Sequence, residues 1–300
     1  MKTKTIAICL LLATLATREA SAQVWAPITP PDSASRNDYR TELSYAAPSR
    51  IALGSVRLGD IDTLHTRVSY LATTRTSSNF TWRAGLTWDR YAFGTPAGAL
   101  IPDSVHGLAL KLATDWRLTD RWSVQFEASP GLYSDFADIG FNDLNSPFAL
   151  MATYSVNRDL QFFARANVTF RGEFPVIGGP GVRWKFAERS TLWLALPKPR
   201  IEYALHPDLT LHVGGELRGG VFRVGEQFGT QQGRPNLDHA DLNYREIRAG
   251  AGARWQLEKN LALTAEGGWL IDRRFRFRDQ NLQLNGDGAP YFQLGLSGSF

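Results

Sequence analysis

Cysteine and long apolar runs are what this chain of 300 residues most clearly lacks. The only cysteine is Cys9, and methionine occurs twice. Beyond residue 22 no run of 18 apolar residues occurs, which excludes a helical membrane protein. The formal net charge of +4 is small for this length, and basic residues are interleaved with acidic ones, so the charge pattern does not indicate nucleic-acid binding.

The first residues have the features of a secretory signal peptide. Lys2 and Lys4 precede the apolar stretch Ile6–Leu15, which is too short to span a bilayer as a helix. Ala20-Ser21-Ala22 has the small-x-small pattern of a cleavage site. We therefore expect an exported protein without cysteine after cleavage, and hence without a disulfide or a thiolate metal site.

Aromatic residues and glycine are plentiful, with 9 Trp, 9 Tyr, 17 Phe and 27 Gly. From about Arg40 onward, apolar and polar residues also alternate with a period of two. In Leu160–Phe170 every even position is apolar, while Gln161 and Arg165 stand at odd positions. A β-strand places alternate side chains on opposite faces, whereas residues two apart on a helix lie about 200° apart around its axis. The pattern predicts strands with one apolar and one polar face.

Fourteen such strands are expected. The connections between them are alternately tight and long, and the tight ones contain the turn formers Asn, Asp, Ser and Pro. Short turns on one side and long loops on the other are typical of outer-membrane barrels, and an even count puts both ends of the barrel on the periplasmic side. The expected strands are 40–47, 64–75, 79–92, 105–118, 121–134, 147–156, 160–170, 180–187, 190–196, 199–206, 208–224, 243–257, 260–274 and 290–300.

One connection on the long-loop side, Pro197-Lys198-Pro199, is very short. The hairpin Leu192–Leu205 around it is the weakest expected pair, and without it the count falls to 12. The expected long loops are 48–63, 93–104, 135–146, 171–179, 225–241 and 275–289.

The faces opposite the apolar ones carry charges, and the apolar faces carry tryptophans, some of them beside turns. Charges inside a ring of strands and aromatic residues at the two lipid–water boundaries are the arrangement of a membrane barrel. The expected lumen-lining residues are Arg83, Lys111, Asp115, Arg117, Glu127, Arg165, Arg183, Lys185, Glu202, His212, Glu216, Arg218, Arg248 and Arg254. The expected membrane-interface aromatic residues are Trp82, Trp88, Trp116, Trp122, Trp184, Trp255, Trp269 and Phe300.

Backbone groups find no water partner in hydrocarbon, so only helices or a closed sheet can cross a membrane. We therefore predict an all-β fold, an antiparallel up-and-down transmembrane β-barrel of 14 strands, with 12 as the alternative. The barrel is expected to cover residues 39–300, after a signal peptide of residues 1–22 and a periplasmic lead-in of residues 23–38. The expected location is the outer membrane of a Gram-negative cell.

The end of the chain resembles the closing strand of bacterial outer-membrane barrel proteins. Phe292, Leu294 and Leu296 share one face with the terminal Phe300, and polar residues stand between them. The resemblance implies that the barrel-assembly machinery recognises this strand.

A second resemblance rests on three stretches, Leu196–Tyr203, His206–Leu211 and Gly214–Val224. These stretches resemble an uncharacterised family of bacterial outer-membrane proteins, a domain-of-unknown-function family. The resemblance implies an outer-membrane barrel, but it implies no activity and carries over no catalytic residue.

The charged inner face leaves two functions open. In the first, the charges line a water-filled pore and set its selectivity, and the protein is a passive pore for small solutes. Alternatively, they pair across strands and plug the lumen of a structural barrel. An outer-membrane lipid-modifying enzyme is a third reading, with His212 as general base, but spacing places no serine beside it as a nucleophile. We expect no enzyme activity, no cofactor and no metal site.

Arg273–Asp279 alternates arginine with phenylalanine where a strand meets a loop. The arginines are candidates to bind lipopolysaccharide phosphates, with the phenylalanines in the acyl boundary. A solvated loop base with ordinary aromatic residues is the alternative. The expected partners are outer-membrane lipid and lipopolysaccharide, and the oligomeric state stays open.

Overall fold

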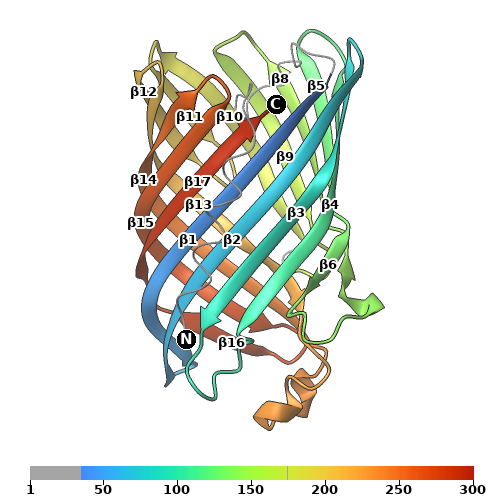
Figure 1. Ribbon diagram of the computed structural model, residues 1–300, viewed down its shortest axis with the longest axis vertical. Coiled ribbons are helices and arrows are strands. Elements are labelled where there is room, and N and C mark those ends of the chain that lie inside the picture. Colours follow the sequence, from blue (N-terminus) through green and yellow to red (C-terminus); the bar gives the residue numbers. More distant parts are fainter. Residues whose placement is uncertain (1–34, 174) are drawn as a thin grey trace.

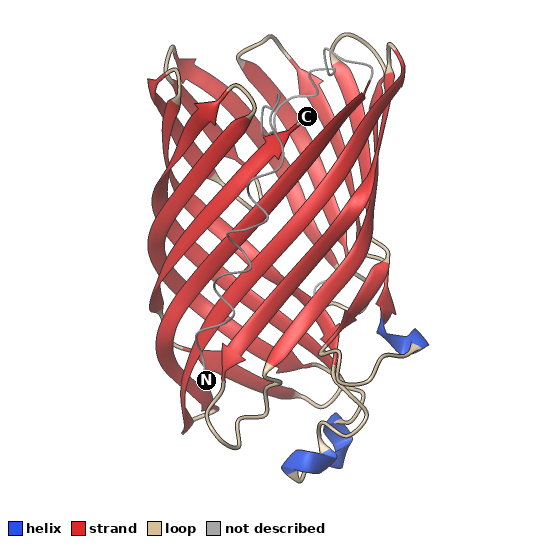
Figure 2. Ribbon diagram, in the orientation of Figure 1, coloured by secondary structure: helices blue, strands red, loops and turns tan. Residues whose placement is uncertain are grey.

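A single sheet of antiparallel strands closes on itself to form a barrel (Figures 1 and 2). The computed structural model describes residues 35–173 and 175–300. The first strand, β1 (Ser35–Leu53), pairs with β2 (Val56–Ser77) on one side and with the last strand, β17 (Ala289–Ser299), on the other. The predicted all-β barrel is therefore confirmed. Within the described residues, no helix is long and apolar enough to cross a membrane.

The barrel wall contains 14 strands, as predicted. Three wall positions are each occupied by two consecutive segments, β5 with β6, β7 with β8, and β16 with β17, because each pair continues along the same neighbours. The remaining strands are β3 (Phe80–Gly94), β4 (Ser104–Arg117), β5 (Trp122–Ala128), β6 (Gly131–Ser134), β7 (Leu144–Asn145), β8 (Phe148–Ser155), β9 (Leu160–Val168), β10 (Val176–Ala187), β11 (Ser190–Leu194), β12 (Arg200–His206), β13 (Leu209–Arg223), β14 (Asp241–Glu258), β15 (Leu261–Phe277) and β16 (Leu282–Gly286).

The two ends of the barrel differ. The tight turns gather at one end, which we call the turn end; it is the upper end in Figure 1, where the C-terminus also lies. The longer connections gather at the opposite loop end, where Figure 2 shows short helices. These 3-10 helices are η2 (Phe141–Asp143), η3 (Thr230–Gln232) and η4 (Pro235–Leu237).

Two of the predicted long loops are wrong. Residues 48–63 continue β1 and β2 to a tight turn at Gly54 and Ser55, where Gly54 has φ +60°. Residues 275–289 contain the end of β15 and all of β16. Both hairpins carry exposed charges on their outer sides, such as the ion pair between Arg57 and Asp60. Outside the hydrocarbon a strand needs no apolar outer face, so the alternation stops before the strand does.

The connection between β13 and β14 folds back over the loop end. The Thr230 backbone N–H and hydroxyl donate to the Asp238 carboxylate at 2.8 and 2.5 Å, and these bonds lower the pKa of the Asp238 carboxyl below its usual value. The bonds close η3 against η4 and direct Leu237 into the barrel mouth, where it is fully buried.

Candidate functional site: the barrel lumen

Inner side chains are arranged by strand parity. Consecutive residues of a strand face opposite sides of the wall, so the antiparallel register lines up every second residue around the lumen. Arg83 of β3 shows this, because its guanidinium donates to the Asp115 carboxylate of β4 at 2.9 Å. The lumen is therefore built from cross-strand pairs.

One side of the lumen is buried, and charged side chains of opposite sign meet there. We call it the packed network; its members are at most 7% exposed. Arg218 lies 2.7 Å from Glu42 and 2.8 Å from Glu216, and it donates to Gln293 at 2.8 Å. Its guanidinium also lies 3.1 Å from the His65 ring, which is 3.1 Å from Asp89 on its other side. The network consists of Glu42, Ser44, His65, Arg218, Glu246, Arg248, Glu266, Arg273 and Gln293.

A second cluster continues the packed network around β14, β15 and β17. Arg248 contacts Glu246 at 2.5 Å and donates to Ser44 at 2.6 Å, and its guanidinium lies 4.9 Å from the Tyr291 ring centre. Tyr291 donates to Glu266 at 2.6 Å. Buried charges are tolerated only when paired and hydrogen-bonded, so this side is structural filling.

His212 and Lys198 both reach the Glu266 carboxylate, at 3.0 and 3.8 Å. Lys198 also donates to Glu216 at 3.1 Å. Lys198 belongs to the short connection between β11 and β12, so that connection lies at the depth of the lumen and not above it. Sequence reasoning placed Glu216 and His212 on the inner face but missed Lys198 and Glu42.

The opposite side of the lumen is accessible to water. We call it the open side, and all its charged side chains are partly or largely exposed. Lys111 pairs with Glu127, and their side chains are 31% and 28% exposed. Glu202 accepts from the Trp193 indole N–H at 3.0 Å and contacts Arg200 at 2.7 Å. The open side consists of Lys111, Arg117, Glu127, Arg165, Arg183, Lys185, Glu202 and Arg254.

The structure thus divides the predicted lumen residues between the two sides. Arg218 and Arg248 lie in the packed network, while Arg83, Asp115, His212 and Glu216 lie between the two sides and are ion-paired or hydrogen-bonded. The remaining eight form the open side. Nothing in the sequence separated these groups. The position of a residue in the alternating pattern predicts which face of the wall its side chain lies on, but not which side chains it meets in the lumen.

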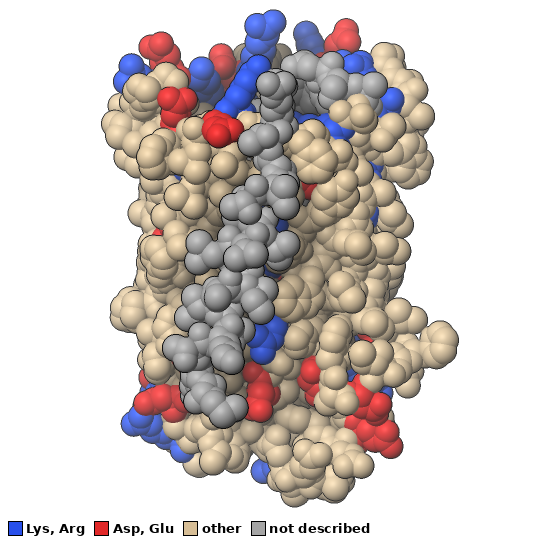
Figure 3. Space-filling model, in the orientation of Figure 1, with Lys and Arg blue, Asp and Glu red and all other residues tan. Residues whose placement is uncertain are grey.

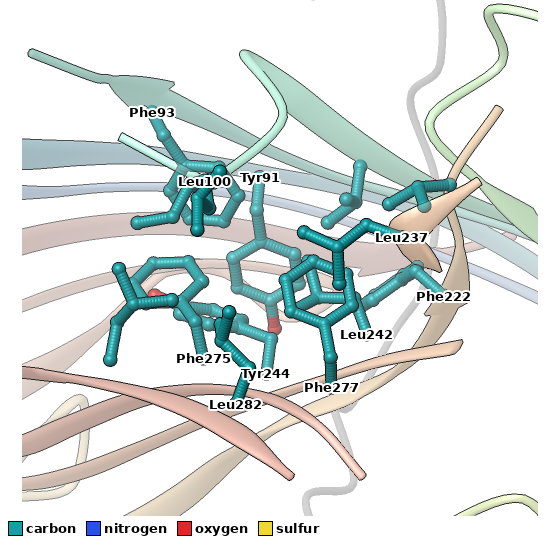
Figure 4. Close-up of a cluster of buried hydrophobic side chains, with 14 of the residues drawn as sticks. Tyr91, Phe93, Leu100, Phe222, Leu237, Leu242, Tyr244, Phe275, Phe277 and Leu282 are labelled. Atoms are coloured by element: carbon teal, nitrogen blue, oxygen red, sulfur yellow. The ribbon is translucent and has the colours of Figure 1, made fainter. Parts of the chain in front are cut away.

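An apolar cluster lies at the loop end of the lumen, and we call it the mouth cluster (Figure 4). Tyr91 and Phe93 of β3 meet Tyr244 and Phe275 edge to face, with ring centres 5.0 Å apart. Its buried members are Ile51, Ile61, Tyr91, Phe93, Leu100, Ile101, Val105, Phe222, Val224, Leu237, Leu242, Tyr244, Phe275, Phe277, Leu282 and Leu284.

The Arg273–Asp279 stretch differs from both of its expected arrangements. Phe275 and Phe277 are fully buried in the mouth cluster and face neither acyl chains nor solvent. Arg276 pairs with Glu173, and Arg274 with Asp272 at 3.1 Å. Parity puts the phenylalanines inside, and their partners come from strands far away in sequence.

The outer face of the wall is apolar. Seven of the eight expected interface aromatics are about half exposed, and so are leucines such as Leu86 and Leu150. Charged side chains gather near the two ends of the face seen in Figure 3. The half-exposed aromatics are Trp82, Trp116, Trp122, Trp184, Trp255, Trp269 and Phe300, while Trp88 is half-buried and stacks on His106 at 6.3 Å.

One serine–histidine pair escaped the sequence analysis. The Ser104 hydroxyl lies 3.1 Å from the His106 ring nitrogen at the loop end of β4, and the ring stacks on Phe136 at 4.8 Å. No described carboxylate is hydrogen-bonded to this ring, so the pair lacks the acidic group that orients a catalytic histidine. Among the described residues, no three His, Cys, Asp or Glu side chains group to hold a metal ion.

Several solved barrel structures have a fold similar to that of this chain. An outer-membrane channel from Pseudomonas putida F1 is 13% identical, with a TM-score of 0.47 over 91% of this chain and 100% of that one. The toluene transporter TodX of Pseudomonas putida is 11% identical, with a TM-score of 0.40 over 90% of each chain. The translocator domain of the autotransporter NalP from Neisseria meningitidis is 12% identical, with a TM-score of 0.39 over 89% of each chain. At such values these proteins carry no functional information for this chain.

The sequence matches none of the curated proteins with which it was compared. It does match one family over residues 72–298, which run from β2 to β17. The resemblance expected from the sequence is thereby confirmed, and the chain belongs to the family described as a domain of unknown function, DUF6268.

Proposed function

We propose that the protein is a passive channel for small solutes in the outer membrane of a Gram-negative cell, with the open side of the lumen as its path. The observation that carries the proposal is the division of the lumen. A purely structural barrel gains nothing from partly exposed, charged inner side chains on β4, β5, β9, β10, β12 and β14. The outer partners are lipid and lipopolysaccharide around the apolar wall, and the assembly machinery at the last strand.

The charges of the open side favour anions. Arg183 donates to the Arg158 carbonyl at 3.1 Å, and Arg254 donates to the Gln256 amide oxygen at 3.2 Å. Both partners are uncharged, so both guanidinium groups keep their full positive charge toward the lumen. The open side also carries more cations than carboxylates, and such an excess of positive charge raises the local anion concentration in a narrow path.

Planar bilayers test the channel directly. Under a KCl gradient, the purified protein should give discrete conductance steps with a reversal potential of the sign for chloride preference. The double variant Arg183→Gln with Arg254→Gln should move that potential toward zero. Arg57→Gln, which removes an exposed charge of the β1–β2 hairpin, is the matched control and should leave it unchanged.

A structural barrel is the second candidate, and the mouth cluster favours it. Sixteen buried apolar side chains obstruct the loop end of the lumen. If no conductance is found with properly folded protein, the structural barrel replaces the channel.

A further inference from the structure

Two strands of the wall are too short to cross a membrane. β11 has 5 residues and β12 has 7, whereas a tilted transmembrane strand needs about 9–11. The connection between them bonds to β13, with Gly215 N–H donating to Pro199 and Leu217 N–H to Pro197 at 2.9 and 2.8 Å. The wall at this place therefore ends partway through the hydrocarbon.

Beyond the short hairpin, two strand edges face each other without a strand between them. Residues 176–180 of β10 pair with β9 on one side, and β11 joins the other side only from Val182. Residues 218–222 of β13 pair with β14, and their other edge has no partner strand among the described residues. These two edges form the sides of an opening in the wall.

Gly219 lies on the unpaired edge of β13 beside the opening. Gly219 has φ +134°, and a Cβ on it would lie 2.0 Å from the Tyr244 carbonyl oxygen, so only glycine fits there. At the end of β13, the Arg223 carbonyl accepts from Asp135 N–H at 3.0 Å, next to β6. The loop after β9 borders the opening on its loop-end side, where the Glu173 N–H donates to the Asn243 side chain at 2.8 Å.

A cavity of about 130 Å³ lies behind the opening. Gly219 to Phe222 form one wall, Thr169 and Pro147 another, and Tyr91 and Tyr133 add aromatic rings. At its inner end Arg67 pairs with Asp89 at 2.6 Å. The cavity is therefore mainly apolar, with one charged pair on the lumen side.

The rim of the opening is apolar. Phe170 is 72% exposed, Val176 60% and Leu194 57%. Side chains of this kind face acyl chains, so the opening lies at hydrocarbon depth. Unpaired strand edges are tolerated at that depth only where they are buried in protein or line a water-filled cavity. Pro180 removes one unpaired N–H from the β10 edge, which reduces this cost.

We propose that this opening is a lateral portal through which small uncharged molecules with an apolar body and one polar group pass between the lumen and the outer hydrocarbon layer. The cavity is close in size to an engineered cavity of about 150 Å³ that binds benzene. Its rings accommodate the apolar body, and the Arg67–Asp89 pair binds the polar group. This proposal rests on the proposed channel function only for the part of the path that leads through the lumen to the other end of the barrel.

Spin labels on single cysteines test the portal, in a Cys9→Ser background reconstituted into liposomes. Val221→Cys and Thr169→Cys place the label on two sides of the cavity. Val213→Cys, on the same strand as Val221 and 55% exposed, is the lipid-facing control, and Thr191→Cys is the lumen control. The relaxing agents are oxygen, which concentrates in hydrocarbon, and a water-soluble nickel chelate.

Labels in the portal should be as accessible to oxygen as the one at Val213 and as accessible to nickel as the one at Thr191. Access to only one agent, or to neither, at both positions would overturn the proposal. Calorimetric titration with phenol gives a second readout: saturable binding should be lost in Val221→Trp and retained in Val213→Trp, and equal heats in the two variants also contradict the portal. Since neither readout needs conductance, a portal without a channel, or a channel without a portal, is recognisable.

Discussion

At the scale of single residues, the packed network fills its side of the lumen with paired charges. Arg218 contacts two carboxylates, an amide and a histidine ring while only 4% of its side chain is exposed. The pairing matters more than the number of contacts, because a buried charge that loses its partner keeps its full desolvation cost.

Replacing Arg218 by alanine should therefore destabilise the barrel by about 3–5 kcal/mol, since Glu42 and Glu216 are left facing each other. Arg57→Ala, which breaks an exposed pair on the β1–β2 hairpin, should change stability by no more than about 0.5 kcal/mol. Urea unfolding in lipid vesicles measures both. A cost for Arg218→Ala as small as that of the control contradicts the packed network.

On the outer face of the wall, introducing a charge should be destabilising. Leu110 is 51% exposed, and in a water-soluble protein arginine at such a position costs little. In a bilayer, Leu110→Arg should cost about 2–4 kcal/mol, because the charge enters hydrocarbon. Gln125→Arg on the inner side of the neighbouring strand is the control for added charge. Equal unfolding free energies for the two variants in vesicles would show that Leu110 does not face lipid.

At the scale of elements, alternation was enough to place all 14 wall strands, and it failed where the environment changed. Residues 48–63 and 275–289 are strands beyond the lipid, where the outer face is free to be polar, so the pattern predicted loops. The short Pro197–Pro199 connection did signal an anomaly. Its structural meaning, a wall that ends partway, depends on the edges of β10 and β13 that lack a partner strand, which the pairing shows and the sequence does not.

The two ends of the barrel provide a topology test. An epitope inserted between Gly54 and Ser55 lies at the loop end and should be detected by antibody on intact cells. The same epitope between Asn157 and Arg158 lies at the turn end and should be detected only after the outer membrane is permeabilised. Detection in the reverse pattern would invert the proposed orientation.

At the scale of the whole molecule, the lumen has a packed side, an open side and an apolar cluster at its loop end. Phe93 and Phe275 lie in stretches that the sequence predicted to be loops. Their meeting was not predictable either, since they are far apart in sequence and joined only by closure of the barrel. For the same reason the sequence predicted the same lumen-lining position for Arg248 and Arg254, although Arg248 is buried and Arg254 is partly exposed.

Thiol labelling of four single-cysteine variants, again in a Cys9→Ser background, tests this division most directly. Thr153 and Thr191 are small inner residues of the open side, while Ser44 and Thr63 are small inner residues with no exposed surface. With the protein in liposomes, a charged, membrane-impermeant maleimide should label cysteine at Thr153 and Thr191 rapidly and spare cysteine at Ser44 and Thr63. Labelling of all four at one rate, or of none, would contradict a lumen that is water-filled on one side and packed on the other.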